Sequence, residues 1–357
     1  MMRRPQTPSA SLTVILIAIA VPMAAQPAML AVADGAEANA AVRIEPRQWW
    51  STWFGETEAT LTFDVASREP LDGRLTWTYS SGQRTLARGE VPVKGRSTVV
   101  SIPLHVPPVG EGVVLDTQLA LTVVEGGETL AELVRPMWVY PQDPFFGRSA
   151  WLEALNITLY DPTRDGKTAG VFREMSIPFK SVRGVGAVES LADGVLVIGE
   201  GVSLADHRAL GAALAAAAAR GVPVLCLAPS DGSLPLPGAG DPASPSPSRV
   251  EFRRQDVIRQ FDKRLDAESW PPAGRVVASR LAIASGRGGV RAEVSDAQQA
   301  WPWLEVEYPR DGATLVVCGF GLIESWDDGP TPRVLLARLF EKLDPADKGK
   351  NSDELGE

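Results

Sequence analysis

Cysteine and histidine are scarce in this chain, and their scarcity excludes several kinds of protein. Only two cysteines and two histidines occur among 357 residues. Two cysteines cannot form a disulfide scaffold, and no His/Cys/Asp/Glu spacing indicates a metal site. Cys226 and Cys318 both lie in very apolar runs, VPVLCL and ATLVVCGFG, where cysteine behaves as a small buried hydrophobe. We therefore expect two unbridged, unreactive thiols, with oxidation to a single bridge as the alternative in an exported protein. We expect no cofactor.

Basic clusters are also missing. The formal net charge is -9, and no run of lysine and arginine alternates with aromatic residues. Proteins that bind nucleic acid need a basic surface to neutralise phosphates. The composition therefore argues against nucleic acid as a partner.

Residues 1–33 have the layout of a secretory signal peptide. Arg3 and Arg4 give a positive start, residues 12–21 form an apolar run, and the small residues AVA stand directly before Asp34. The apolar run is much shorter than the roughly 20 residues of a membrane-spanning helix. We expect export to the periplasm, cell envelope or medium, with no stable membrane span after cleavage.

A β-rich domain is predicted over residues 45–141, after a flexible mature N-terminus at 34–44. In ATLTFDV, alternation places Leu61, Phe63 and Val65 on one face, and GRLTWTY repeats the pattern. Turn signals such as LDG, SSG and GEG separate the runs. Short alternating strands with such turns indicate an antiparallel β-sandwich. The segment resembles the immunoglobulin-like (Ig-like) modules of secreted bacterial proteins.

The pattern changes after a hinge at residues 142–150. DGVLVIGEG and VPVLCLAP are continuous apolar runs, and the alanine-rich helix between them is expected to begin at a Ser203 cap and end at Gly221. Alternating buried strands and helices indicate a doubly wound α/β domain with a parallel sheet, here over residues 151–343. It would contain a Pro/Ser-rich loop at 230–249, and a disordered charged tail would follow at 344–357.

These strands, with WPWLEVEYPRDGATLVVCGFG further on, resemble a degenerate class I glutamine amidotransferase-like domain. The resemblance implies a flavodoxin-like fold, in secreted bacterial proteins that often carry carbohydrate-processing modules. Active members place cysteine in G-x-C-x-G on a tight elbow, with a later histidine. Here leucines flank Cys226, and both His105 and His207 precede it. Without that base a thiolate is not activated, so we exclude Cys-His-Glu catalysis and expect a pseudoenzyme.

The stretch DPTRDGKT, residues 161–168, comes close to a phosphate-binding P-loop. Its first glycine is replaced by Asp161, whose carboxylate would repel phosphate, and Pro162 offers no N–H group. We read it as an acidic turn before a helix.

Polar residues follow the predicted parallel strands, and ligands of doubly wound sheets bind beyond those strand ends. Two carboxylates there could serve as general acid and base. The candidate ligand-binding residues are Asp161, Glu200, Ser230, Asp231, Glu324 and Trp326.

Three functions remain open from the sequence. The first is a secreted non-catalytic module that binds a saccharide or small polar molecule, with a carbohydrate or envelope protein as partner. The second is a hydrolase using Asp161 and Glu200, and the third is a structural cell-envelope component without a pocket. Tryptophans 49, 50, 53 and 138 could stack on sugar rings or fill the core and the interface with the next domain.

Overall fold

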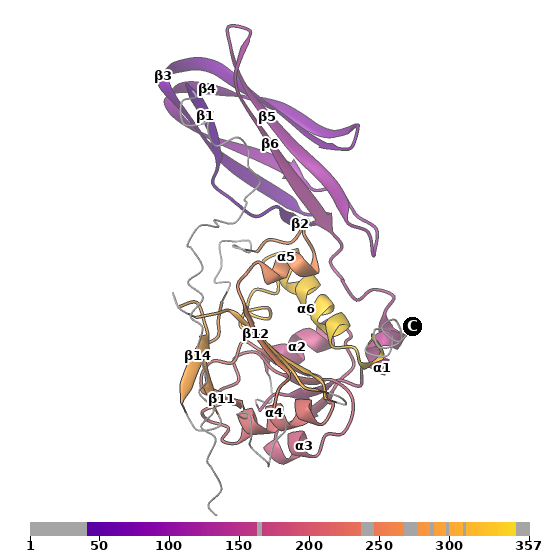
Figure 1. Ribbon diagram of the computed structural model, residues 1–357. Coiled ribbons are helices and arrows are strands. Elements are labelled where there is room, and N and C mark those ends of the chain that lie inside the picture. Colours follow the sequence, from indigo (N-terminus) through magenta and orange to yellow (C-terminus); the bar gives the residue numbers. More distant parts are fainter. Residues whose placement is uncertain are drawn as a thin grey trace, which may run out of the picture. The chain divides into compact units, whose positions relative to one another are not determined.

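The computed structural model describes residues 41–162, 166–236, 246–267, 277–285, 289–297, 300–309 and 312–347. The predicted leader, most of the N-terminal segment before residue 45, much of the Pro/Ser-rich loop and most of the tail lie outside these ranges. Residues Ala41–Glu357 belong to one compact unit, which is rich in β-structure, with several sheets and some helices (Figure 1). No helix in the described ranges is long and apolar enough to span a membrane.

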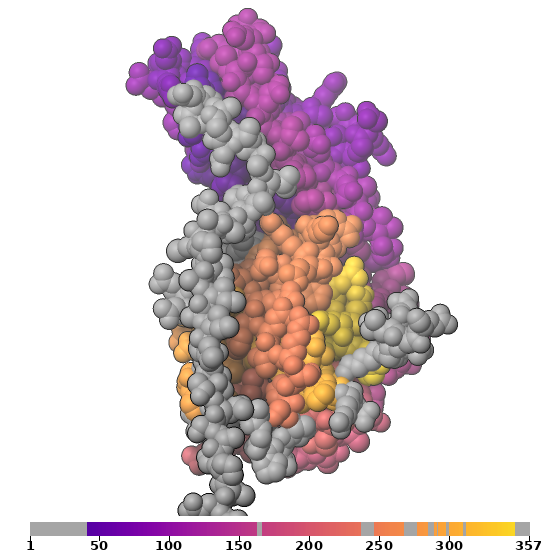
Figure 2. All heavy atoms as spheres, in the orientation of Figure 1, coloured from indigo at the N-terminus to yellow at the C-terminus, as the bar shows by residue number. Residues whose placement is uncertain are grey.

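The first sheet has six strands, drawn in indigo to magenta in Figures 1 and 2. Its neighbours are antiparallel except β2, which runs parallel to β6. Two strands are long, with 24 residues in β3 and 22 in β4. The strands are β1 (Val42–Pro46), β2 (Thr52–Phe54), β3 (Glu58–Ser81), β4 (Arg84–His105), β5 (Leu115–Glu125) and β6 (Glu128–Tyr140).

One core serves both halves of β3. The register of β3 against β4 shifts between Ala66 and Leu71, and β1 pairs with the first half of β3 while β5 pairs with the second. Leu61 and Phe63 from the first half share a buried cluster with Leu75 from the second. The predicted alternation is thus present, but a bulge stands where the sequence suggested a turn between short strands, since a register shift bends a strand without reversing it.

The second sheet has seven strands in the order β12-β15-β16-β10-β9-β7-β8. From β16 to β8 all neighbours are parallel, whereas β15 and β12 are antiparallel. The parallel sheet predicted from the sequence is present over five strands, but the whole sheet is mixed, because β15 and β16 are close in the chain and pair antiparallel. The strands are β7 (Thr158–Tyr160), β8 (Lys180–Val182), β9 (Leu196–Ile198), β10 (Val224–Leu227), β12 (Arg249–Arg253), β15 (Trp303–Glu307) and β16 (Thr314–Cys318).

Helices cover both faces of this second sheet. One apolar core contains residues of α1 (Ser149–Ala154), α2 (Lys167–Glu174), α5 (Val257–Phe261) and α6 (Pro330–Lys342). The other contains residues of α3 (Val185–Glu189) and α4 (Leu210–Ala219), together with a small third sheet. That sheet consists of β11 (Ser233–Leu236), β13 (Leu281–Ser285) and β14 (Val290–Val294), and a short 3-10 helix, η2 (Pro345–Asp347), follows α6.

The alanine-rich helix starts later than the sequence suggested. The expected cap bond exists, since the Asp206 N–H donates to Ser203 Oγ at 3.1 Å. It closes only a turn, and α4 begins at Leu210, after Ala209 with a φ of 70°. A left-handed residue interrupts helical geometry, so residues 203–209 form a loop. Because the helix starts later, residues 203–209 are free to fold as a loop beside the strand ends.

Candidate functional site

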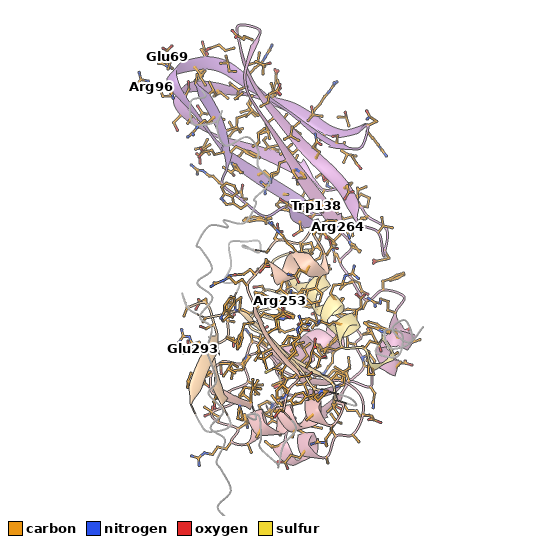
Figure 3. The ribbon with its side chains drawn as sticks, viewed as in Figure 1. Glu69, Arg96, Trp138, Arg253, Arg264 and Glu293 are labelled. Atoms are coloured by element: carbon orange, nitrogen blue, oxygen red, sulfur yellow. The ribbon has the colours of Figure 1, made fainter. Side chains whose placement is uncertain are left out.

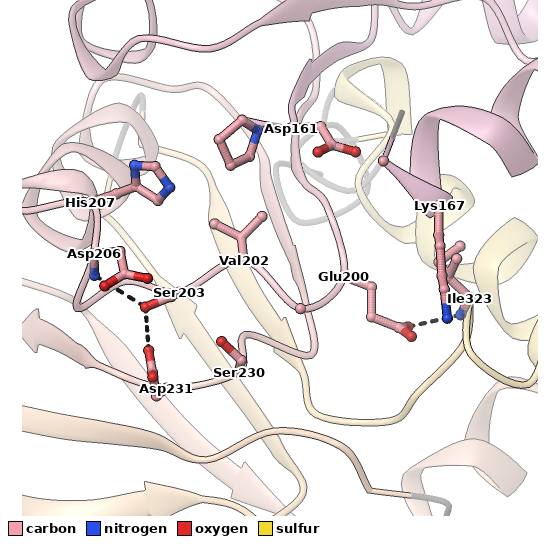
Figure 4. A pocket seen from close by; sticks show the side chains of 13 residues that line it. Asp161, Lys167, Glu200, Val202, Ser203, Asp206, His207, Ser230, Asp231 and Ile323 are labelled. Atoms are coloured by element: carbon pink, nitrogen blue, oxygen red, sulfur yellow. Dashed lines mark hydrogen bonds between the residues drawn. The ribbon is translucent and has the colours of Figure 1, made fainter. Parts of the chain in front are cut away.

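A cavity of about 580 Å³ lies beyond the carboxyl ends of β7, β9 and β10 (Figure 4). Because these strands are parallel neighbours, the residues that follow them meet at one edge of the sheet. Four of the six predicted residues line it: Asp161, Glu200, Ser230 and Asp231. The remaining lining residues are Pro162, Gly166, Lys167, Gly201, Val202, Ser203, Asp206, His207 and Ile323.

Asp161, directly after β7, is only 5% exposed. Its carboxylate lies against the backbone of Gly166, where an added Cβ would come within 1.6 Å of Oδ2. Gly166 precedes the first residue of α2, Lys167, whose side chain is exposed on the cavity wall. Asp161 is therefore confined by close packing at the start of α2.

Glu200 connects two strand ends through its carboxylate. Oε2 accepts the N–H of Ile323 at 2.8 Å, and Oε1 accepts the N–H of Glu324 at 2.7 Å. Its own N–H donates to Thr168 Oγ1 at 2.9 Å. Burial raises the pKa of Glu200 to about 7, although the two backbone bonds and the nearby Lys167 oppose the shift. Glu200 thus fixes the loop after β16 against the end of β9.

Ser203 and its neighbours form another wall. The Ser203 hydroxyl donates to Asp231 Oδ1 at 2.5 Å and accepts the Asp206 N–H. The His207 ring packs edge-on against Tyr160, with centroids 5.7 Å apart. This wall presents two carboxylates, a hydroxyl and an imidazole to the cavity, a set suited to hydrogen-bonding a polar ligand.

Two predicted site residues lie elsewhere. The side chain of Glu324 is exposed outside the cavity lining, and only its backbone N–H is used, by Glu200. Trp326 is 3% exposed and packs in the apolar core beside α6. Sequence reasoning did not place Lys167, Ser203, Asp206 or His207 at the site. Lys167 belonged to a stretch interpreted as an acidic turn before a helix, and residues 203–207 were expected in the first turns of the alanine-rich helix.

Cys226 lies inside β10, away from any elbow. The bend after that strand falls at Ala228, which has a φ of 25°. Burial raises the pKa of Cys226 to about 12 and holds that of Cys318 well above its usual range. Cys226 belongs to the core under α4 and Cys318 to the core on the opposite face of the sheet. Both are free, and thiols on opposite faces cannot reach disulfide geometry without backbone movement.

We expect neither thiol to react in the native chain. A buried thiol with a raised pKa has almost no thiolate at neutral pH. Labelling with a thiol reagent should give no adduct under conditions that fully label an unfolded sample, in which both cysteines react. Rapid modification of Cys226 in the folded chain would contradict its placement.

The tryptophans of the first sheet do not share one exposed face. Trp49 is 67% exposed, whereas Trp53 packs against the core of the first sheet. The Trp50 and Trp53 rings are tilted by 49°. Trp138, labelled in Figure 3, packs against the core of the second sheet. Of the two roles considered from the sequence, these positions favour core and interface filling for Trp53 and Trp138.

Comparison with known proteins does not identify a family for this chain. No protein-family model matches the chain, and no curated protein matches it. Among solved structures, the sensor domain of the anti-sigma factor RsgI4 from Pseudobacteroides cellulosolvens has 11% identity and a TM-score of 0.22, covering 28% of this chain and 96% of that one.

Two larger proteins that act on sugars are equally distant. A Paenibacillus sp. cycloisomaltooligosaccharide glucanotransferase has 10% identity and a TM-score of 0.23, over 45% of this chain and 20% of that one. A glycosyl hydrolase family 2 member from Bacteroides cellulosilyticus DSM 14838 has 11% identity and a TM-score of 0.23, over 53% and 27%. This chain thus spans a minor part of either protein, and such scores do not define a common fold.

Proposed function

We propose that this chain is an exported, non-catalytic binding protein that takes a saccharide or another small polar molecule. The observation that carries the proposal is the cavity of about 580 Å³ at the strand ends, where eight of the thirteen lining residues are polar or charged. A concave site with convergent polar groups at the carboxyl ends of parallel strands is the usual ligand site of α/β sheets. A carbohydrate or an envelope protein would be its partner.

The domain assignment is part of this proposal. Residues 45–141 would be an Ig-like module, joined through a hinge at 142–150 to a degenerate amidotransferase-like, flavodoxin-like domain at 151–343. The five parallel strands with helices on both faces support the second assignment. The burial of Cys226 in β10, outside the cavity lining, supports a binding role rather than amidotransferase chemistry.

A carboxylate-dependent hydrolase is the second candidate, favoured by one observation. The pKa of Glu200 is raised to about 7 by burial, as in many general acids. However, both of its oxygens already accept backbone N–H groups, which suits a positioning role better than proton transfer to a substrate. A purely structural envelope component would not need the cavity.

A thermal-shift screen tests the proposal. Oligosaccharides, nucleotides and divalent metals form the screen. We expect oligosaccharides or another small polar molecule to raise Tm, because a ligand at a hundredfold excess over its Kd stabilises the folded chain by about 2.7 kcal/mol, and a shift with metals alone would contradict the proposed ligand class. Asp161→Asn should remove the shift by changing a cavity wall. Glu189→Gln, at an exposed position of α3 outside the cavity, should leave it intact. No shift with any class, or a shift insensitive to Asp161→Asn, would contradict a ligand site here.

A further inference from the structure

The charges that line the cavity are unbalanced. Among the described lining residues, four are acidic, Asp161, Glu200, Asp206 and Asp231, and one is a lysine, Lys167. Figure 4 shows the lysine on the Glu200 side of the cavity, where it partly opposes the rise in the pKa of that carboxyl caused by burial. The described lining residues therefore include more acidic than basic groups even when Glu200 is protonated, and this excess would attract a cationic ligand and repel an anionic one.

Asp206 and Asp231 are the acids of the wall built around Ser203. The Ser203 hydroxyl bonds to both residues, at 3.1 Å from the Asp206 nitrogen and 2.5 Å from Asp231 Oδ1. Figure 4 shows these three residues together, with Lys167 and Glu200 on the other side of the cavity. Ser203 thus holds both residues at one end of the pocket.

No cation of the described chain neutralises these two carboxylates. Neither Asp206 nor Asp231 takes part in a salt bridge between described residues. Both side chains are exposed at the cavity, so a ligand can reach them without a rearrangement of the fold. Their remaining acceptor sites are suited to the N–H donors of an ammonium group.

We propose that the ligand is an amine-bearing, hydroxylated molecule of the amino-sugar class, with its ammonium group between Asp206 and Asp231. Ser230 and His207, also on the cavity wall, would bond to its hydroxyl groups. This inference rests on the proposed function and narrows its ligand class: a neutral sugar would leave the two carboxylates without a counter-charge.

Calorimetry with a matched pair of trisaccharides tests the charge. The glucosamine trimer carries amines, and the N-acetylglucosamine trimer has the same length without their charge. At about pH 6 we expect the amine form to bind at least about tenfold more tightly, since a charge-assisted hydrogen bond contributes roughly 1.5 kcal/mol or more. Its affinity should fall as NaCl is added, because the carboxylates are exposed to salt.

Variants locate the ammonium site. Asp206→Asn and Asp231→Asn should each weaken binding of the amine trimer by about tenfold and leave any binding of the acetylated trimer unchanged, while Glu189→Gln should change neither. Equal binding of both trimers, lost in Asp161→Asn, would overturn the amine inference and support the proposed cavity. Binding of neither trimer would overturn the inference as well, and the wider ligand screen would then decide the proposed function.

Discussion

Replacing Gly166 with alanine is expected to destabilise the folded chain by about 3 kcal/mol, because an added methyl group would overpack the start of α2. The new Cβ would lie 1.6 Å from Asp161 Oδ2 and 2.2 Å from its Cγ. The backbone itself is not the obstacle, since φ and ψ at Gly166 are -58° and 137°, which alanine adopts freely. Asp161 is only 5% exposed, and its carboxyl group would have to leave its packed position against Gly166 and turn into the cavity to make room for the methyl group.

Gly170 provides the matched control in the same helix. A Cβ there meets nothing within 4 Å, so Gly170→Ala should stabilise the chain by about 0.5–1 kcal/mol through helix propensity. Asp161→Ala removes the clashing atoms, and in that background Gly166→Ala should cost less than about 1 kcal/mol. Urea unfolding of the unsubstituted chain, the two single variants and the double variant measures the coupling between positions 161 and 166. An equal cost of Gly166→Ala in both backgrounds would show that Asp161 does not limit this position.

The strands of the second sheet were the most predictable part of this site. Runs such as Leu196–Ile198 and Val224–Leu227 are buried throughout, and burial on both faces leaves a continuous apolar signal. Once the strands are placed, the parallel arrangement brings Asp161, Glu200 and Asp231 to one edge. The location of the site could therefore be predicted from the apolar strand pattern and from the rule that ligands bind beyond the carboxyl ends of parallel strands.

The loop at residues 203–209 was less predictable. Ser203 and Asp206 satisfy the cap pattern of a helix start, and their bond does form. The helix begins only at Leu210, because Ala209 has a left-handed backbone conformation. In the same loop, Ser203 bonds to Asp231, which follows β10. Those are tertiary effects that override local preference. The position of Trp326 was also not predictable from local pattern. An aromatic residue after a strand can face either the core or the edge of the sheet where ligands bind, and Trp326 packs in the core beside α6.

Glu200→Gln is expected to lower stability most at mildly acidic pH. The carboxyl accepts the Ile323 and Glu324 N–H groups. When it is protonated its hydroxyl oxygen can still accept one of them, whereas a glutamine amide offers one oxygen and turns an NH₂ group toward the other donor. Leaving one buried donor without its acceptor costs about 1–3 kcal/mol. At pH 5 the glutamine chain should therefore unfold at a lower urea concentration than the unsubstituted chain.

The difference between the two chains should shrink as pH rises. Burial raises the pKa of Glu200 from 4.5 to about 7 in the folded state, so between these values the folded chain binds more protons than the unfolded one. Stability then falls with rising pH, by about 2 kcal/mol between pH 5 and 8, and the Glu200→Gln chain has no such proton to lose. Other titrating groups are common to both chains and cancel in the comparison. Urea unfolding at pH 5, 6, 7 and 8 measures the trend. A difference that instead widens with pH would show that the two N–H donors outweigh burial and that Glu200 is a stable carboxylate throughout, which would remove the one observation favouring a catalytic acid.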